Sequence, residues 1–148
     1  AQLVDKEIAT FRDPKEIRIV SRLAIDLRVM ADEIELGRVF GNLFENARRY
    51  GRSMNTGIAA VNVSYARSGP WIIISVRDHG PGIPDYADQK VFEKFYSLAR
   101  PGSQRKSTGL GLPFVREIAA LHQGRITLRN ADGGGAVAVL SLPAEPQT

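Results

Sequence analysis

The sequence predicts an α+β two-layer sandwich, in which a mixed, mostly antiparallel sheet of about five strands packs on about three helices. Apolar residues recur at helical spacing in two long segments, 32–50 and 111–122. Four β-rich segments, each bounded by turn residues, lie at 57–66, 71–77, 125–130 and 136–142. Neither a GxxxxGK[ST] phosphate loop nor a GxGxxG motif after the first strand is present, so the P-loop and Rossmann folds are excluded.

Length and composition are those of one ordinary globular domain, which we assign to residues 1–148. The absence of cysteine excludes disulfides and cysteine metal sites. No apolar run approaches the roughly 18 residues of a membrane helix. The net charge is +4, and most Lys and Arg residues are scattered. The exceptions are one set at Arg48, Arg49 and Arg52 and a looser set at Arg100, Arg105 and Lys106. We therefore expect no nucleic-acid partner and no direct membrane contact.

The first 30 residues are expected to form a short helix at 3–12, followed by a strand or a hairpin. Apolar alternation at Ile17 and Ile19, and again over 24–30, supports the β prediction.

A long amphipathic helix is predicted to begin after Asp32, which occupies an N-cap position with Glu35 in the matching capping-box position. Gly51 is a fitting C-terminal stop for this helix. Its apolar face is formed by Leu36, Val39, Phe40, Leu43, Phe44 and Ala47.

The segment 71–77 (WIIISVR) is a nearly continuous apolar run, which predicts a central strand buried on both faces. After it we expect a turn at 78–82, a short helix at 88–96 and a loop at 97–108. The second amphipathic helix, 111–122, is expected to end at Gly124.

Two asparagines, Asn42 and Asn46, lie four residues apart on the long helix and therefore project from one face, followed by Arg49 and Tyr50. An amide oxygen can complete the octahedron of Mg²⁺ around nucleotide phosphates. Arg49 could contact a phosphate, and Tyr50 could pack on the sugar or base. Alternatively, both asparagines bond neighbouring backbone groups.

Asp78 ends an apolar strand and begins the sequence DHGPG. A carboxylate at the end of a buried strand requires a partner, and the exocyclic amine of adenine is a suitable donor. Gly80 and Gly82 allow a sharp turn and a close approach of the base to the backbone. A plain turn between two elements is the alternative.

Two further motifs flank the loop at 97–108. In TGLGL, Thr108, Gly109 and Gly111 could direct a hydroxyl and backbone N–H groups at phosphates from a helix N-terminus. In FEKFY, Phe92 and Phe95 are either anchors beneath a mobile flap or ordinary core aromatics.

In this order, NLFENARRY (42–50), DHGPG (78–82), FEKFY (92–96) and TGLGL (108–112) resemble the N, G1, F and G2 boxes of the catalytic and ATP-binding domain of bacterial sensor histidine kinases. That family belongs to the Bergerat-fold superfamily with gyrase B, Hsp90 and MutL. The resemblance covers roughly residues 1–143. Pro113 departs from the pattern, because the family more often has a small residue there, but proline is acceptable in a first helical turn.

The resemblance implies ATP and Mg²⁺ as cofactors. It makes Asn46 the metal ligand and groups Asn46 with Asn42 and Arg49 as the catalytic set. It implies an ATP lid over 97–107, with the phosphate-contacting cation left open among Arg100, Arg105 and Lys106. The remaining nucleotide contacts that it implies are Tyr50, Asp78, Gly80, Gly82, Thr108, Gly109, Leu110, Gly111 and Leu112.

Asn42 stands where the hydrolysing relatives carry a water-activating glutamate, and an amide cannot accept a proton at neutral pH. Glu45 lies roughly 100° around the helix from Asn46. These positions favour phosphoryl transfer to a partner side chain over hydrolysis. A related ATPase, an anti-sigma-type serine kinase and a degenerate, non-catalytic interaction module are the alternatives.

The implied function is histidine autophosphorylation in a two-component phosphorelay. Neither His79 nor His122 fits the acceptor role, because the first lies in the nucleotide turn and the second ends a helix. We therefore expect two partners: the protein's own dimerisation and histidine phosphotransfer domain, absent from this chain, and the receiver domain of a response regulator. The chain is then the cytoplasmic domain of a longer, inner-membrane sensor kinase.

Overall fold

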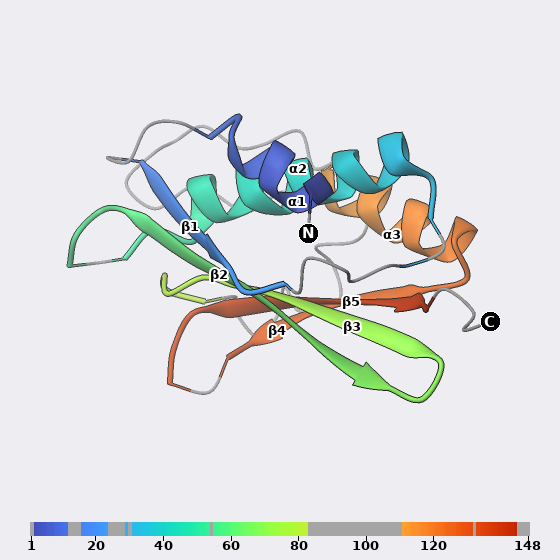
Figure 1. Ribbon diagram of the computed structural model, residues 1–148. Coiled ribbons are helices and arrows are strands. Elements are labelled where there is room, and N and C mark those ends of the chain that lie inside the picture. The colour runs from blue at the N-terminus through green and yellow to red at the C-terminus, as the bar shows by residue number, and fades with distance from the viewer. Residues whose placement is uncertain are drawn as a thin grey trace.

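The computed structural model describes residues 2–11, 16–23, 29, 31–53, 55–82, 111–131 and 133–144. The elements are α1 (Gln2–Ile8), β1 (Ile17–Ser21), α2 (Glu33–Tyr50), β2 (Ala59–Ser68), β3 (Trp71–Arg77), α3 (Gly111–Leu121), β4 (Arg125–Asn130) and β5 (Ala136–Pro143). The helix expected at 88–96 and the loop expected at 97–108 lie outside the described residues. Figure 1 shows α1, α2 and α3 together over one face of the sheet, which confirms the predicted two-layer sandwich. None of the described helices is long and apolar enough to cross a membrane.

The sheet is mixed and mostly antiparallel, as predicted. Its strand order is β1-β2-β3-β5-β4. Only β1 and β2 pair in parallel; the pairs β2–β3, β3–β5 and β4–β5 are antiparallel. Of the strand or hairpin expected near the N-terminus, the strand at Ile17–Ser21 is confirmed. Val29, further along, forms an isolated bridge with Ala144.

The largest boundary differences from the prediction are at α1 and at β2, which also begins at Ala59 instead of residue 57. The first helix ends at Ile8 instead of residue 12. Strand β2 runs on to Ser68, because Ser68 pairs with Trp71 across a tight connection at Gly69 and Pro70. Gly69 has a φ of 59°, a conformation that glycine adopts without strain.

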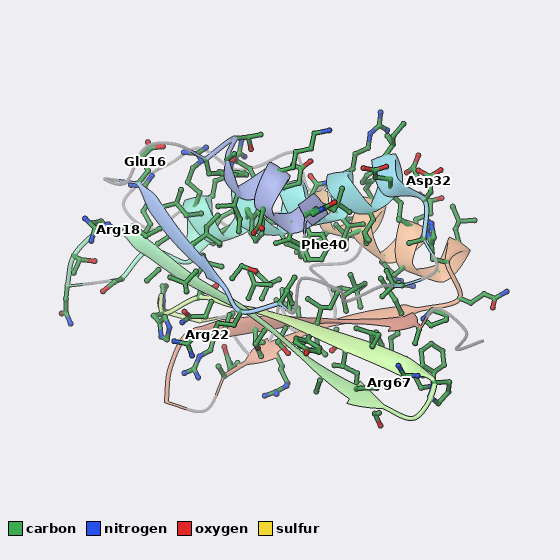
Figure 2. All side chains as sticks on the ribbon, in the orientation of Figure 1. Glu16, Arg18, Arg22, Asp32, Phe40 and Arg67 are labelled. Atoms are coloured by element: carbon green, nitrogen blue, oxygen red, sulfur yellow. The ribbon has the colours of Figure 1, made fainter. Side chains whose placement is uncertain are left out.

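The core lies between the helices and the covered face of the sheet. Phe40 and Phe44 of α2 are fully buried, and Figure 2 shows Phe40 between the two layers. Phe11 meets Phe44 edge to face, with 5.8 Å between the ring centroids. Beneath these rings lie Ile72, Ile74 and Val76 of β3 and Leu140 and Leu142 of β5, all buried.

The expectation that β3 is buried on both faces is wrong. Its residues alternate, with Ile72 and Ile74 buried beneath the helices and Ile73 and Ser75 only half-buried on the opposite face. The strand is central in the sheet, as predicted, but the described helices cover only one face of that sheet. An apolar run thus indicated the position of the strand and not the burial of its second face.

Helix α2 begins as predicted, with Asp32 as N-cap accepting a hydrogen bond from the backbone N–H of Glu35 at 3.0 Å. The backbone N–H of Asp32 donates instead to Nε2 of His122, at 2.9 Å, where the capping box would have used the Glu35 side chain. The His122 Nδ1 lies 2.9 Å from the carbonyl oxygen of Ile118, so it donates to that oxygen. The end of α3 therefore holds the start of α2.

Candidate functional site

Asp78 lies directly after β3, and its carboxylate is fixed by backbone groups. Oδ1 accepts from the N–H of Gly80 at 3.0 Å and from the N–H of Ala136 at 3.1 Å. The backbone N–H of Asp78 in turn donates to the carbonyl of Ala136 at 2.9 Å. Two backbone donors therefore hold one carboxylate oxygen in place, and the half-buried side chain has a defined orientation.

The end of α2 lies against this turn with no room for a side chain. A Cβ on Gly51 would stand 2.7 Å from Cβ and Cγ of Asp78 and 2.8 Å from its Oδ2. A Cβ on Gly80 would stand 2.5 Å from the backbone carbon of Gly51. Gly51 has a φ of −100°, so the glycine is required by this close approach and not by its backbone conformation.

The turn before β5 supports the other side of Asp78. Gly135 has a φ of 80°, and a Cβ there would collide with the carbonyl oxygen of Asp78. Gly82 also has a positive φ, 85°, and a Cβ there would lie 2.6 Å from Oδ1 of Asn130. The DHGPG turn is thus enclosed by the end of α2 and by the β4–β5 connection.

The four α2 residues predicted to line the site, Asn42, Asn46, Arg49 and Tyr50, are all half-buried. Tyr50 is the last residue of the helix and precedes Gly51, so the helix leads directly to Asp78. Arg49 donates from Nε to Oε1 of Glu45 at 2.9 Å, and its side chain is 41% exposed. A guanidinium with that much exposure remains accessible to an anionic ligand.

Glu45 is committed to an ion-pair cluster. It bonds Arg48 through two contacts and Arg49 through one, and Arg48 also reaches Glu16 at 3.4 Å. Arg52 lies 3.6 Å from Glu16 and donates to the carbonyl of Arg48 at 2.8 Å. The hydrogen bond from Arg48 is the main cause that lowers the pKa of Glu45, against the desolvation that raises it. The same bond raises the pKa of Arg48.

Asn42 also borders a groove of about 710 Å³. Leu3 and Glu7 of α1 line it on one side and Phe114 of α3 on the other, with α2 as the floor. The groove is open toward solvent.

Of the glycine turn before α3, the structure describes only the last two residues. Gly111 is the first residue of α3, and Leu112 follows it, partly buried against the core. Thr108, Gly109 and Leu110 lie outside the described residues, as do Phe92, Phe95 and the whole segment predicted as a lid.

The predicted Mg²⁺ ligand, Asn46, is half-buried on α2. The described residues contain no group of three or more His, Asp or Glu side chains that could hold a metal by themselves. A single half-buried amide suits an ion that takes most of its oxygen ligands from phosphates and water.

Sequence reasoning missed the residues that shape the Asp78 turn from other elements, Gly51, Asn130, Gly135 and Ala136. The sequence indicates Gly51 only as a helix stop. The run Gly133-Gly134-Gly135 carries a signal, because three consecutive glycines exceed what a hairpin connection requires. All three have positive φ, at 86°, 109° and 80°.

The comparisons with known proteins agree with this fold. The family described as "Histidine kinase-, DNA gyrase B-, and HSP90-like ATPase" matches residues 31–146. The match covers most of the chain, so the chain belongs to that family.

Its relatives are sensor kinases. Sensor protein CreC of Escherichia coli (strain K12) is 38% identical over 141 residues, which are 95% of this chain and 27% of CreC. Signal transduction histidine-protein kinase AfsQ2 of Streptomyces coelicolor is 41% identical over 115 residues, 78% of this chain and 20% of AfsQ2. The chain therefore spans only a minor part of the length of these relatives.

Among solved structures, the catalytic domain of histidine kinase ThkA matches with a TM-score of 0.80 and 26% identity, covering 98% of this chain and 94% of that one. The resemblance to the catalytic and ATP-binding domain of sensor histidine kinases is thus confirmed, together with the Bergerat fold.

Proposed function

We propose that this chain is the ATP-binding catalytic domain of a longer two-component sensor histidine kinase. The observation that carries the proposal is the junction of α2 with the turn after β3. There the carboxylate of Asp78 is held by two backbone N–H groups and lies against Gly51. A fixed carboxylate beside a glycine surface, in a chain of this family, suits recognition of a flat base.

Asp78 selects the base in this proposal. Oδ1 already accepts two hydrogen bonds, so Oδ2 is the oxygen with most capacity to accept one from the exocyclic amine of adenine. Guanine presents a carbonyl oxygen at the corresponding position, which would face the carboxylate acceptor to acceptor. A site built around such a polar contact rejects the wrong base strongly.

The triphosphate is held by groups along α2 and at the start of α3. Asn46 is the protein ligand of Mg²⁺, which neutralises phosphate charge when bound. Arg49 contacts a phosphate oxygen after leaving or sharing its bond with Glu45. The N-terminus of α3, preceded by Thr108, Gly109 and Leu110, presents backbone N–H groups to the phosphates.

The reaction is transfer of the γ-phosphoryl group to a histidine on the protein's own dimerisation domain. The bond from the γ-phosphorus to the β–γ bridging oxygen breaks, a phosphorus–nitrogen bond forms, and ADP leaves. This chain contributes positioning and charge stabilisation, while the nucleophile and its base come from the other domain. The histidine kinase ThkA has been solved in complex with response regulator protein TrrA. We propose a response-regulator receiver domain as the next acceptor and an inner-membrane sensor as the full protein.

Hydrolysis of ATP is the less favoured activity. Asn42 cannot accept a proton, and Glu45 is held by Arg48 and Arg49 with a lowered pKa, which makes it a weak base.

Calorimetric titration with ATP and with GTP, each with Mg²⁺, tests the proposal. We expect saturable binding of ATP and no binding of GTP. Asn46→Asp and Asp78→Ala should each abolish ATP binding and leave the folded state intact by circular dichroism. Asn55→Asp, in the exposed turn before β2, is the matched control and should bind ATP like the parent chain. Undiminished ATP affinity in both site variants would refute the site.

A further inference from the structure

The face of the sheet opposite the helices carries a cavity of about 370 Å³. One row of paired residues crosses four strands there. Asn62 of β2 pairs with Arg77 of β3, Arg77 pairs with Val137 of β5, and Val137 pairs with Arg129 of β4. Paired residues project to the same face of a sheet, so this register brings Arg77 and Arg129 to one cavity with an amide beside them.

The next row completes the lining. Ser64 of β2 pairs with Ser75 of β3, and both line the cavity. Arg22 enters from the end of β1, where its backbone N–H donates to the carbonyl of Val63 at 2.8 Å. Figure 2 shows Arg22 on the side of the sheet away from the helices. The cavity therefore receives side chains from both edges and from the centre of the sheet.

The lining groups are mostly hydrogen-bond donors. Three guanidinium groups, two hydroxyls and one amide surround the cavity, and no carboxylate is among the described residues that line it. Arg77 is fixed on one side by donating to the carbonyl of Gly134 at 3.3 Å. Arg22 and Arg129 bring two further guanidinium groups to the same recess, and an anion bound there could accept hydrogen bonds from both.

We propose that this cavity, defined by Arg22, Arg77 and Arg129 with Asn62, Ser64 and Ser75, is a second anion site that binds a phosphate group. A phosphate carries more than one negative charge and tetrahedral oxygens, so it can accept from donors on several sides at once. A carboxylate, which is planar and singly charged, matches this distribution less well. The volume suits inorganic phosphate, pyrophosphate or a small phosphomonoester.

This site is separate from the proposed nucleotide pocket. Arg77 and Asp78 are adjacent in the chain, yet Arg77 lines the open-face cavity while the carboxylate of Asp78 lies against Gly51 of α2. His79 connects the two regions, because its Nε2 accepts from Nδ2 of Asn62 at 2.9 Å. The end of β3 thus serves one site on each face of the sheet.

The test is a titration of the ¹⁵N-labelled chain followed by nuclear magnetic resonance, with inorganic phosphate, pyrophosphate, glycerol 3-phosphate and acetate as probes at constant ionic strength. We expect saturable shifts of the amides at 62–64 and 75–77 with the phosphates. Arg129→Gln and Arg22→Gln should each weaken binding at least tenfold. Arg125→Gln is the matched control: it lies on β4 and on the same face, but outside the lining residues, and should stay within twofold.

The outcomes separate the alternatives. A stronger response to glycerol 3-phosphate assigns a phosphomonoester, and a stronger response to phosphate or pyrophosphate assigns the free anion; both support the site. Shifts that rise linearly, or an equal loss in Arg125→Gln, would overturn it in favour of general charge screening. Equal affinity for acetate would overturn the phosphate assignment. Melting curves establish that each variant is folded.

Discussion

The two ends of α2 are held in place by opposite means. At its start, side chains supply the contacts: Asp32 caps the N–H of Glu35, and His122 accepts the N–H of Asp32. At its end, the contact depends on glycine having no side chain, because Gly51 lies closer to Asp78 and Gly80 than any Cβ would allow.

This difference separates stability from function. Hydrogen bonds at an exposed helix start can be lost singly, each at a modest free-energy cost. The close contact of the Gly51 backbone with the Asp78 side chain leaves no space for added atoms, so a larger residue must displace either α2 or the turn after β3. We therefore expect substitutions at the start of α2 to change the free energy of unfolding and substitutions at its end to change ligand binding as well.

Gly51→Ala should have the largest effect. Its φ of −100° suits alanine, so the substitution introduces the steric contact with Asp78 and no backbone strain. We expect ATP affinity to fall at least tenfold and the free energy of unfolding to fall by about 1–3 kcal/mol. Calorimetry and urea unfolding measure the two quantities.

Gly41→Ala is the control, on the same helix and with the same added methyl group. There the nearest atom is the flexible carboxylate end of Glu7, at 3.3 Å. Alanine in a helix interior is favoured over glycine by about 0.5–1 kcal/mol, so stability should be equal or higher and ATP affinity unchanged. Equal loss of ATP affinity in both variants would contradict the special role of Gly51.

The two ends of α2 also differ in how far the sequence could predict them. Local patterns were sufficient for α2 and its N-cap Asp32, for the bounds of β3 and for the two-layer class, because spacing along one element determines them. The second role of Gly51 was not predictable, since its partner Asp78 belongs to another element. The same holds for His122, which replaces the Glu35 side chain at the start of the helix.

The candidate site divides in the same way. The structure brings Asp78, Gly80 and Gly51 into close contact. The four other predicted ligands all lie on α2, and their role in binding stays a prediction: Asn42, Asn46, Arg49 and Tyr50. The error on β3 has a related cause, because an apolar run does not state which face of a sheet the helices cover.

Asp32→Ala should have an intermediate effect that is confined to stability. Loss of the N-cap acceptor removes about 1 kcal/mol from the free energy of unfolding. His122→Ala should cost about 0.5–1 kcal/mol, because it leaves the N–H of Asp32 to solvent. Asp32 and His122 belong to one hydrogen-bond network, because the N–H of Asp32 donates to His122, so the double variant should depart from additivity. ATP affinity within twofold of the parent chain is expected for all three, and a tenfold loss would show that the two ends of α2 are coupled.

Glu45→Gln should have the smallest effect, and that effect should depend on pH. The hydrogen bond from Arg48 lowers the pKa of Glu45 in the folded state, so its stabilisation is present above the ordinary value of 4.5 and is lost as the pH falls through the lowered folded value. The Glu45 side chain is 35% exposed and Arg48 is 24% exposed, so solvent screening limits the gain to well under about 1 kcal/mol. Urea unfolding should therefore separate the two chains near neutral pH and converge in acid.

The double-variant cycle with Arg48→Gln makes this last prediction specific. If the ion pair is the cause, replacing Glu45 in the Arg48→Gln background should change the free energy of unfolding less than in the parent chain. Added salt should reduce the difference as well, because exposed pairs are screened. If Glu45→Gln changes the free energy of unfolding as much in the Arg48→Gln variant as in the parent chain, the stabilisation comes from Arg49, the other partner of Glu45. Because Arg49 is also a proposed phosphate ligand, ATP should then compete with Glu45, and saturating ATP should abolish the pH dependence.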